Sequence, residues 1–208
     1  MLTFPYLVAF FGTHNRLVAL GKRVAGRKYS AAEFTRLIRR QFPSANFSFK
    51  THRDYAVDPD SIIVSGTFDS VDESVGLPSI NITLNYHPEQ DTYFVDLLNW
   101  TQLAFDISEC VWHEVVHRNQ YTQGRKLKPY KSTDPEQEYL GGQDEIEAYG
   151  FSIAAESFVF QKPFESCVMY GVYKTTFDTD LKIVLQLEKQ VNSYLKQLEQ
   201  VYEQAYNN

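Results

Sequence analysis

The sequence predicts an α+β fold, with an antiparallel-rich sheet packed on a functional helix and a helical C-terminal part. Three observations predict it. A helix signal stands at residues 31–42, extended segments occupy residues 62–98, and after Trp100 the apolar period changes to about four residues. Of the 208 residues, 43% are hydrophobic and 22% are charged. This composition is typical of a globular protein and excludes a disordered or fibrous chain.

The N-terminal residues predict an extended arm followed by a helix. Met1–Phe11 is apolar but short, is interrupted by Pro5, and has neither a basic leader nor a small-residue cleavage site. It is therefore expected to be a strand or buried arm rather than a secretory signal. Ser30 and Glu33 have the spacing of a capping box, in which each side chain binds the other residue's backbone N–H. Apolar residues follow at helical spacing as far as Pro43, so a helix is expected over residues 31–42.

Three extended segments predict an antiparallel meander. The segments are residues 62–68, 80–86 and 92–98, and the connections at 69–78 and 87–91 are rich in Asp, Gly and Pro. The second segment alternates strictly, with Ile80, Ile82, Leu84 and Tyr86 on one face and polar residues on the other. Strict alternation indicates a strand with one buried face.

Three helices are expected after Trp100. Leu103, Ile107, Val111 and Val115 recur every four residues and predict a helix over residues 101–121. A second helix begins near residue 144 and continues through 154, and a third, capped by Asp178 or Thr179, ends near residue 206. The expected organisation is one domain over residues 1–178 and a long helix over 179–208. The apolar seam of that helix fits packing on the domain, which we favour, or pairing with a second copy.

Charge is distributed unevenly along the chain. Residues 1–53 contain ten Lys and Arg and one acid, a net charge of +9, whereas the rest carries −15. A nucleic-acid partner is one interpretation; packing of the basic segment against the acidic remainder is favoured. No apolar run approaches the ~18 residues that span a bilayer, so no membrane partner is expected. Two cysteines cannot form a disulfide framework, which predicts a cytoplasmic protein.

The most informative motif is His113-Glu114-Val115-Val116-His117. On a helix, side chains four residues apart share a face, so both imidazoles can bind one zinc ion. Glu114 adjoins them and can take a proton from a water that the metal activates. A catalytic zinc site uses three protein ligands and a water. The helix near residue 144 can supply Glu145 or Glu147 as the third ligand, but not both, because they lie about 200° apart around the helix.

These motifs carry a resemblance to a known family. The HEVVH motif followed by a helix that reads Glu-x-x-Ala resembles the gluzincin-type zinc metallopeptidases, and more closely the HExxH peptidase-like proteins of tailed bacteriophages. The resembling parts are residues 80–84, 113–121, 139–140 and 144–150. The resemblance implies a zincin-like domain with His113, His117 and Glu145 as zinc ligands. In gluzincins with Glu-x-x-x-Asp, the Asp orients a zinc histidine; Tyr149 stands there, so Asp144, Glu147 or a backbone carbonyl is left for that role.

Several other residues have weaker claims to the site. Tyr149 and Tyr121, each one turn beyond an expected ligand, are candidates to stabilise the oxyanion of amide hydrolysis. Cys110 lies one turn before His113; a buried, packed thiol is favoured over a ligand. His14, His52 and His87 lack ligand spacing and are interpreted as loop or surface histidines.

The sequence therefore predicts a zinc metallopeptidase that hydrolyses peptide or protein substrates, with Glu114 as general base. If phage-encoded, it would act in the host cytoplasm or travel in the virion. The alternative is a non-catalytic zincin-fold structural or host-interaction protein, associated with nucleic acid through its basic N-terminal segment.

Overall fold

The computed structural model describes residues 2–42, 47–72 and 77–206. Pro43, which was expected to end a helix, and residues 73–76 of one expected connection lie outside the described residues. The fold is mixed α+β, as predicted. The chain divides into two compact units, one of Ala9–Val115 and one of Met1–Val8 with Val116–Asn208. One uninterrupted helix, α3 (Leu97–Thr122), continues across the boundary between them.

The first residues form a helix rather than a strand. Helix α1 (Phe4–Val24) includes most of the segment that was expected to be extended, so that prediction was wrong. Pro5 is tolerated because it stands in the first turn, where its missing N–H has no partner to lose. Buried residues recur at helical spacing along α1: Leu7, Phe10, Phe11, Leu17, Leu20 and Val24. Apolar residues that recur every three to four positions are typical of a helix, so this signal was available in the sequence.

The predicted capping box is confirmed at helix α2 (Ala31–Arg39). The Glu33 N–H donates to the Ser30 hydroxyl, and the Glu33 carboxylate accepts from the Ser30 N–H at 3.1 Å. Phe34 and Ile38 are buried on one face. The helix ends three residues earlier than residue 42.

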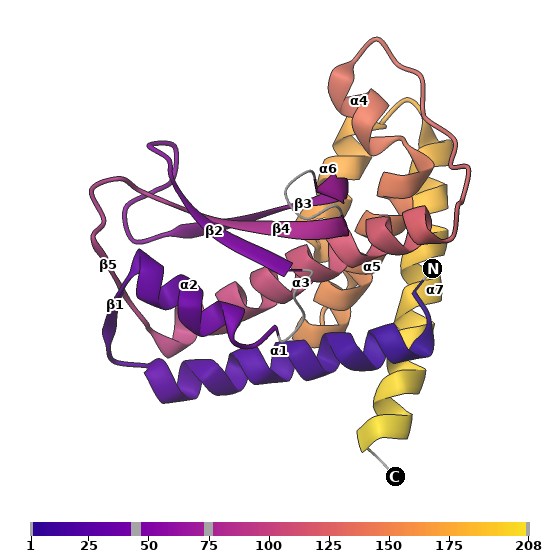
Figure 1. The fold of residues 1–208 in the computed structure, drawn as a ribbon. Helices are drawn as coiled ribbons and strands as arrows, with labels where there is room; N and C mark the ends of the chain where they lie inside the picture. The colour runs from indigo at the N-terminus through magenta and orange to yellow at the C-terminus, as the bar shows by residue number, and fades with distance from the viewer. Residues whose placement is uncertain (1, 43–46, 73–76, 207–208) are drawn as a thin grey trace. The chain divides into compact units, whose positions relative to one another are not determined.

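A three-stranded sheet occupies the Ala9–Val115 unit, in the order β2-β4-β3 (Figure 1). Strand β3 (Ile62–Asp72) pairs antiparallel with β4 (Leu77–Tyr86), as expected. The alternation in β4 is confirmed, because Ile80, Ile82, Leu84 and Tyr86 are all buried. Strand β2 (Phe47–Arg53), which the sequence analysis missed, pairs parallel with β4. Of the three strand pairings in the described residues, two are antiparallel.

The third expected strand is not part of this sheet. Strand β5 (Thr92–Phe94) pairs antiparallel with β1 (Lys28–Ser30), so the predicted meander of three consecutive strands is wrong. Residues 97–98, expected to be extended, already belong to α3. Asp96 explains why the helix begins here. Its carboxylate accepts a hydrogen bond from the Leu98 N–H at 3.1 Å, which favours the start of a helix.

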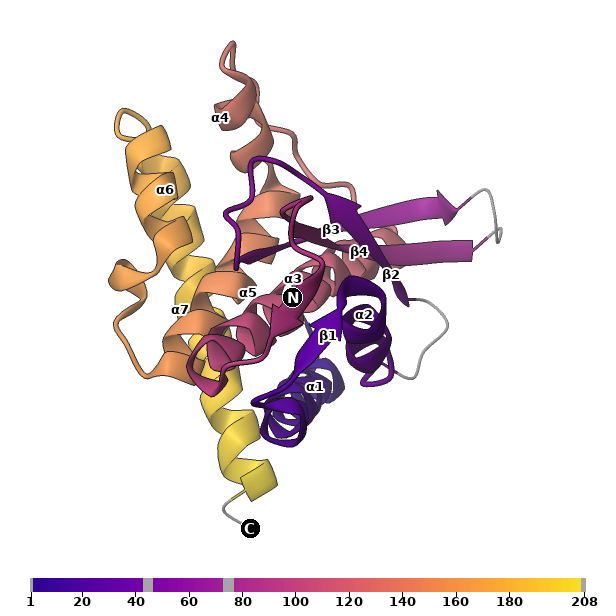
Figure 2. The same cartoon turned by 90° about the vertical axis from the view of Figure 1, so that its left-hand side faces the viewer.

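Helices α1 and α3 approach closely within the same unit. Trp100 Nε1 donates to the Leu17 carbonyl at 2.8 Å, and a Cβ on Gly21 would lie 2.0 Å from the Trp100 ring. Only glycine permits this contact. Trp100 is 3% exposed, and Phe34 packs edge-on against it. The first half of α3 is thereby anchored to α1 and α2 (Figure 2).

The other unit is helical in its described residues. It contains two long helices, α5 (Gln143–Phe160) and α7 (Leu181–Tyr206). The short helix α4 (Pro135–Leu140) precedes α5, and η1 (Phe164–Ser166) and α6 (Val168–Thr176) lie between α5 and α7 in the sequence. Helix α5 is buried along most of its length and packs on α7, where Gly150 faces Gln190 (Figure 2). Asp180, rather than Asp178 or Thr179, accepts from the first turn of α7 through the Lys182 N–H.

The apolar seam that the sequence predicts for α7 is only partly buried. It consists of Leu181, Val184, Val191, Leu195, Leu198, Tyr202 and Ala205. Leu181, Tyr202 and Ala205 are exposed. The buried residues are Ile183, Val184, Leu187, Val191, Tyr194, Leu198 and Val201. This line packs within its own unit, with Tyr194 against Phe151 of α5. None of the described helices is long and apolar enough to cross a bilayer.

Candidate metal centre

Helix α3 presents the two histidines of the motif on one face. It runs as a regular helix over Leu97–Thr122, so His113 and His117 lie one turn apart. His113 is 7% exposed and His117 is half-buried. The apolar side of the same turns, with Val111, Val115 and Val116, is buried and fixes the rotation of the helix.

Helix α5 brings a carboxylate to the second histidine. Glu145 stands in the first turn of α5, is 7% exposed, and its Oε1 lies 3.4 Å from Nε2 of His117. His113, His117 and Glu145 each offer one ligand atom, and these atoms lie within 4.8 Å of one another. Within the described residues, this is the group of His, Cys, Asp or Glu that could hold a metal ion.

Glu147 points to a different partner. Its Oε2 lies 2.6 Å from Nη1 of Arg125, and the residue is 3% exposed. Burial alone would raise the pKa of this carboxyl, but hydrogen bonding and positive charge, including those of Arg125, lower its pKa on balance. The structure therefore brings Glu145, and not Glu147, to the histidines.

Gln120 connects His117 to the helix of Glu145. Its Nε2 donates to the Asp144 carbonyl at 3.1 Å, and its Oε1 lies 3.1 Å from Nδ1 of His117. A carbonyl only accepts, so the amide nitrogen must face Asp144 and the amide oxygen must face the imidazole. His117 then carries its proton on Nδ1 and directs the lone pair of Nε2 toward Glu145. The sequence left Asp144, Glu147 or a backbone carbonyl as candidates to orient a zinc-binding histidine. The structure adds Gln120, which is 3% exposed.

Glu114 lies against strand β3 at a position where only glycine fits. A Cβ on Gly66 would be 2.9 Å from Cγ of Glu114 and 2.8 Å from Sγ of Cys110. Glu114 is 8% exposed and, on α3, adjoins His113. Cys110 is not in the metal-holding group; burial, followed by the charges of Glu109, Glu114 and Asp106, raises the pKa of its thiol.

Three tyrosines gather around Glu145. Hydrogen bonds connect Tyr139 to Tyr149 and Glu145, and burial first, then the charge of Glu145, raises the pKa of Tyr139. Tyr149 packs edge-on against Tyr173, whose hydroxyl donates to the Leu140 carbonyl at 2.9 Å. Tyr149 thus lies near the expected ligand, whereas Tyr121, the other candidate, is 51% exposed.

The remaining histidines separate into two kinds. His52 and His87 lie at the surface as expected, on β2 and in the turn after β4. His14 was expected at the surface but is 8% exposed on α1, where its ring packs against Phe10 and Phe105. Burial lowers the pKa of His14, which favours its neutral form.

The donor set fits zinc. Two imidazoles and one carboxylate are the ligands of many catalytic zinc sites. With bonds of about 2.0–2.1 Å and tetrahedral angles, two ligand atoms are roughly 3.3 Å apart. The distance of 3.4 Å between Nε2 of His117 and Oε1 of Glu145 matches this expected separation. Three protein ligands leave one tetrahedral position for water or substrate.

The comparisons with known proteins give no relative. No family model, curated protein or solved structure matches the chain.

Sequence reasoning missed Gln120, Gly66 and Tyr139. Gln120 stands three residues after His117, a spacing that places it beside the histidine on a helix, and this signal was available. Gly66 comes from a distant strand, and Tyr139 from the short helix before that of Glu145. Neither spacing in the sequence predicts the contact.

Proposed function

We propose that the chain is a zinc-dependent metallopeptidase of the zincin type, similar to the HExxH peptidase-like proteins of tailed bacteriophages. The observation that carries this proposal is the group formed by His113, His117 and Glu145 next to a buried Glu114. Structural zinc sites usually have four protein ligands, whereas a site of three fits catalysis.

The roles of the chain's own residues follow from their positions. Zinc, when bound, supplies Lewis acidity that lowers the pKa of a water to about 7 and polarises the substrate carbonyl. Glu114 accepts the proton of the attacking water on its carboxylate and then delivers it to the leaving amine nitrogen. Gly66 sets how close strand β3 comes to that carboxylate.

Two further groups support the reaction. Gln120 holds the Nδ1 proton of His117 and so keeps the Nε2 lone pair available. Tyr149, one turn after Glu145, can donate a hydrogen bond to the oxyanion that develops on the carbonyl. Strand β3 is the last strand of its sheet, and an extended substrate can pair with its outer edge.

The test is hydrolysis of an unfolded protein, such as reduced casein, by the purified full chain. We expect cleavage that a zinc chelator abolishes and that added zinc restores. The variant Glu114→Gln should retain one zinc per chain and lose most of the activity, because a general base need not bind the metal. Cleavage that is insensitive to the chelator, or full activity of this variant, would refute the proposal.

A second candidate function is binding of a nucleic acid through the basic N-terminal segment. All ten basic residues of positions 1–53 are at least partly exposed, and Arg23, Arg27 and Arg40 line one cavity together with Tyr29. Exposed arginines around an aromatic ring suit a phosphate backbone and its bases. Affinity for a single-stranded oligonucleotide should then fall steeply between 50 and 200 mM salt. An affinity unchanged by salt would exclude this function.

A further inference from the structure

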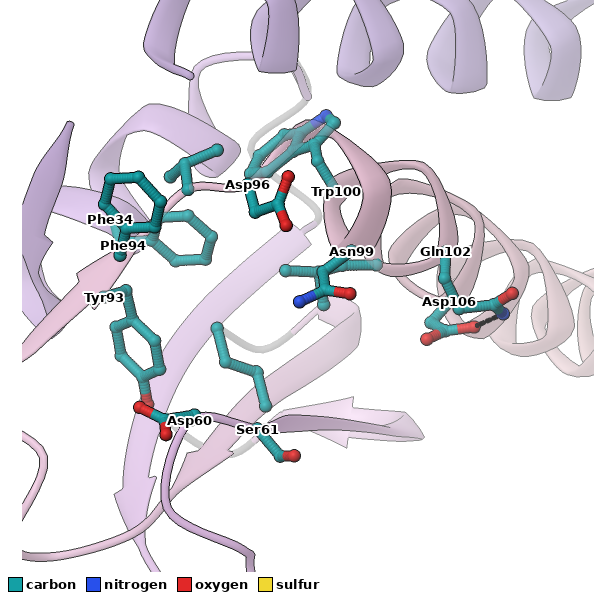
Figure 3. Close-up of a pocket in the computed structure, with 13 residues that line it drawn as sticks. Phe34, Asp60, Ser61, Tyr93, Phe94, Asp96, Asn99, Trp100, Gln102 and Asp106 are labelled. Atoms are coloured by element: carbon teal, nitrogen blue, oxygen red, sulfur yellow. Dashed lines mark hydrogen bonds between the residues drawn. The ribbon is translucent and has the colours of Figure 1, made fainter. Parts of the chain in front are cut away.

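A second pocket lies in the Ala9–Val115 unit, between strand β5, the start of β3 and the first half of α3 (Figure 3). Its volume is about 290 Å³. The buried aromatic rings of Phe34, Tyr93 and Trp100 form its apolar wall. Phe94 also lines the pocket, and 60% of this residue is exposed. Small-molecule sites usually measure about 300–1,000 Å³, so this pocket is at the lower end of that range and is large enough for a single side chain.

The charged residues of the pocket are all acidic. Asp60, Asp96 and Asp106 line it, and none of the described residues that line it is Lys, Arg or His. Asp60 is held in the left-handed region at φ 76°, a conformation that a non-glycine residue rarely adopts. Carboxylates beside aromatic faces are complementary to an organic cation with an apolar stem.

The hydroxyl of Tyr93 supplies an independent sign of a ligand. Tyr93 is 5% exposed, and its buried Oη has no hydrogen-bond partner. Figure 3 shows this hydroxyl end of the ring directed toward Asp60 at the edge of the pocket. A buried hydroxyl without a partner is energetically unfavourable, because the group has lost its hydrogen bonds to water. A donor that entered beside Asp60 would satisfy it.

An inorganic cation is a poorer match for the pocket. Among the described residues, the group whose ligand atoms lie close enough to share a metal is the one on α3 and α5, and it includes none of these aspartates. The rings of Phe34 and Trp100, on the apolar side of the pocket, offer no oxygen ligands. An ammonium or guanidinium group on an aliphatic stem uses both the carboxylates and the rings.

The pocket lies at a defined distance from Glu114. Ile62 lines the pocket and Gly66, four residues further along β3, faces Glu114. Four residues of a strand span about 13 Å. Along α3, Asp106 precedes Glu114 by eight residues, or about 12 Å. The distances estimated along β3 and along α3 agree. An extended peptide covers such a distance in about four residues.

We infer that this pocket binds the lysine or arginine side chain of an extended peptide, about four residues from the bond that Glu114 acts on. The link to Glu114 rests on the proposed peptidase function; the binding of the cationic side chain does not. The peptide backbone would pair with the outer edge of β3, and the cationic end would reach Asp60, Asp96 and the Tyr93 hydroxyl.

The test measures binding of fluorescently labelled seven-residue alanine peptides to the full chain carrying Glu114→Gln, so that no peptide is cleaved. One peptide has a central lysine, and its matched control has norleucine, which keeps the stem and lacks the charge. We expect the lysine peptide to bind at least tenfold more tightly. Asp60→Asn and Asp96→Asn should each reduce this preference severalfold, because asparagine is close in shape to aspartate, tolerates the left-handed backbone of residue 60 and removes the charge.

Glu89→Gln is the matched control, since it removes one exposed negative charge from the same unit outside the pocket. It should leave the preference unchanged. Equal binding of the two peptides, or a lysine preference that survives both aspartate substitutions, would overturn the inference. If the preference is present but the unmodified chain cleaves no protein, the pocket stands and the peptidase proposal fails.

Discussion

Gln120 holds the imidazole of His117 in one tautomer. The amide oxygen of Gln120 accepts from Nδ1 of His117 at 3.1 Å, while its amide nitrogen is committed to the Asp144 carbonyl. A single buried side chain therefore connects the first helix of the site with the start of the second. It fixes the lone pair of Nε2 on the side where Glu145 lies.

Removal of this amide should weaken zinc binding. We expect Gln120→Ala to raise the zinc dissociation constant by about 10–100-fold, the usual cost of losing a group that orients a ligand. Titration against a chelator of known affinity measures the change. Gln123→Ala, in the exposed turn directly after α3, is the matched control and should bind zinc normally. An unchanged affinity in Gln120→Ala would show that the hydrogen bond does not orient the ligand.

Glu145 and Glu147 should respond differently to truncation. Glu145→Ala is expected to remove most of the zinc affinity and, with it, the rise in melting temperature that zinc causes in the unmodified chain. Glu147→Ala is expected to keep the zinc affinity and to lower stability by about 2 kcal/mol, because Arg125 loses a buried partner. Chelator titration and thermal unfolding of both variants distinguish the two effects. The reverse result would assign the third ligand to Glu147.

Gly66→Ala should impair catalysis more than folding. The added Cβ would meet the Cγ of Glu114 at 2.9 Å and must displace this side chain, which we propose as the general base. We expect a fall of at least tenfold in kcat with zinc content unchanged. Gly171→Ala on α6 is the control, since a Cβ there meets nothing within 4 Å, and it should be neutral or slightly stabilising. Unaltered kcat in Gly66→Ala would show that the close approach has no catalytic role.

Removal of the hydroxyl groups should distinguish Tyr149 from Tyr121 as the donor to the oxyanion. If Tyr149 donates to the developing oxyanion, Tyr149→Phe should lower kcat by about 100-fold and leave zinc bound. Tyr121→Phe should have little effect, because this residue is half exposed on the last turn of α3. Steady-state kinetics of the two variants on one peptide provide the comparison. A larger loss in Tyr121→Phe would assign the donor to the other helix.

Local patterns predicted the elements better than their pairing. The Ser30 capping box, the alternation in β4 and the period of α3 act within one element, and each was confirmed. Strand β2 was missed because its pairing with β4 depends on residues some thirty positions away. Strand β5 was assigned to the wrong partner, since order along the chain does not determine which edge a strand joins.

The same distinction applies to the candidate site. The spacing of His113 and His117 follows from one helix, so the residues themselves predicted this pair. For the third ligand they left Glu145 and Glu147 open, and the resemblance to gluzincins favoured Glu145. Gly66 and Tyr139 enter through contacts between segments, and no local pattern contains them. The α1 segment illustrates a different error: Pro5 was given the weight of a helix breaker, although the first turn tolerates it.

X-ray absorption at the zinc edge of the zinc-loaded full chain would identify the metal ligands directly. We expect four-coordinate zinc with two imidazole nitrogens and two oxygens at about 2.0–2.1 Å, one oxygen from Glu145 and one from an exchangeable water. A sulfur scatterer at about 2.3 Å would instead place Cys110 on the metal. That spectrum, or failure of the chain to retain zinc, would contradict the assignment of a His113, His117 and Glu145 site.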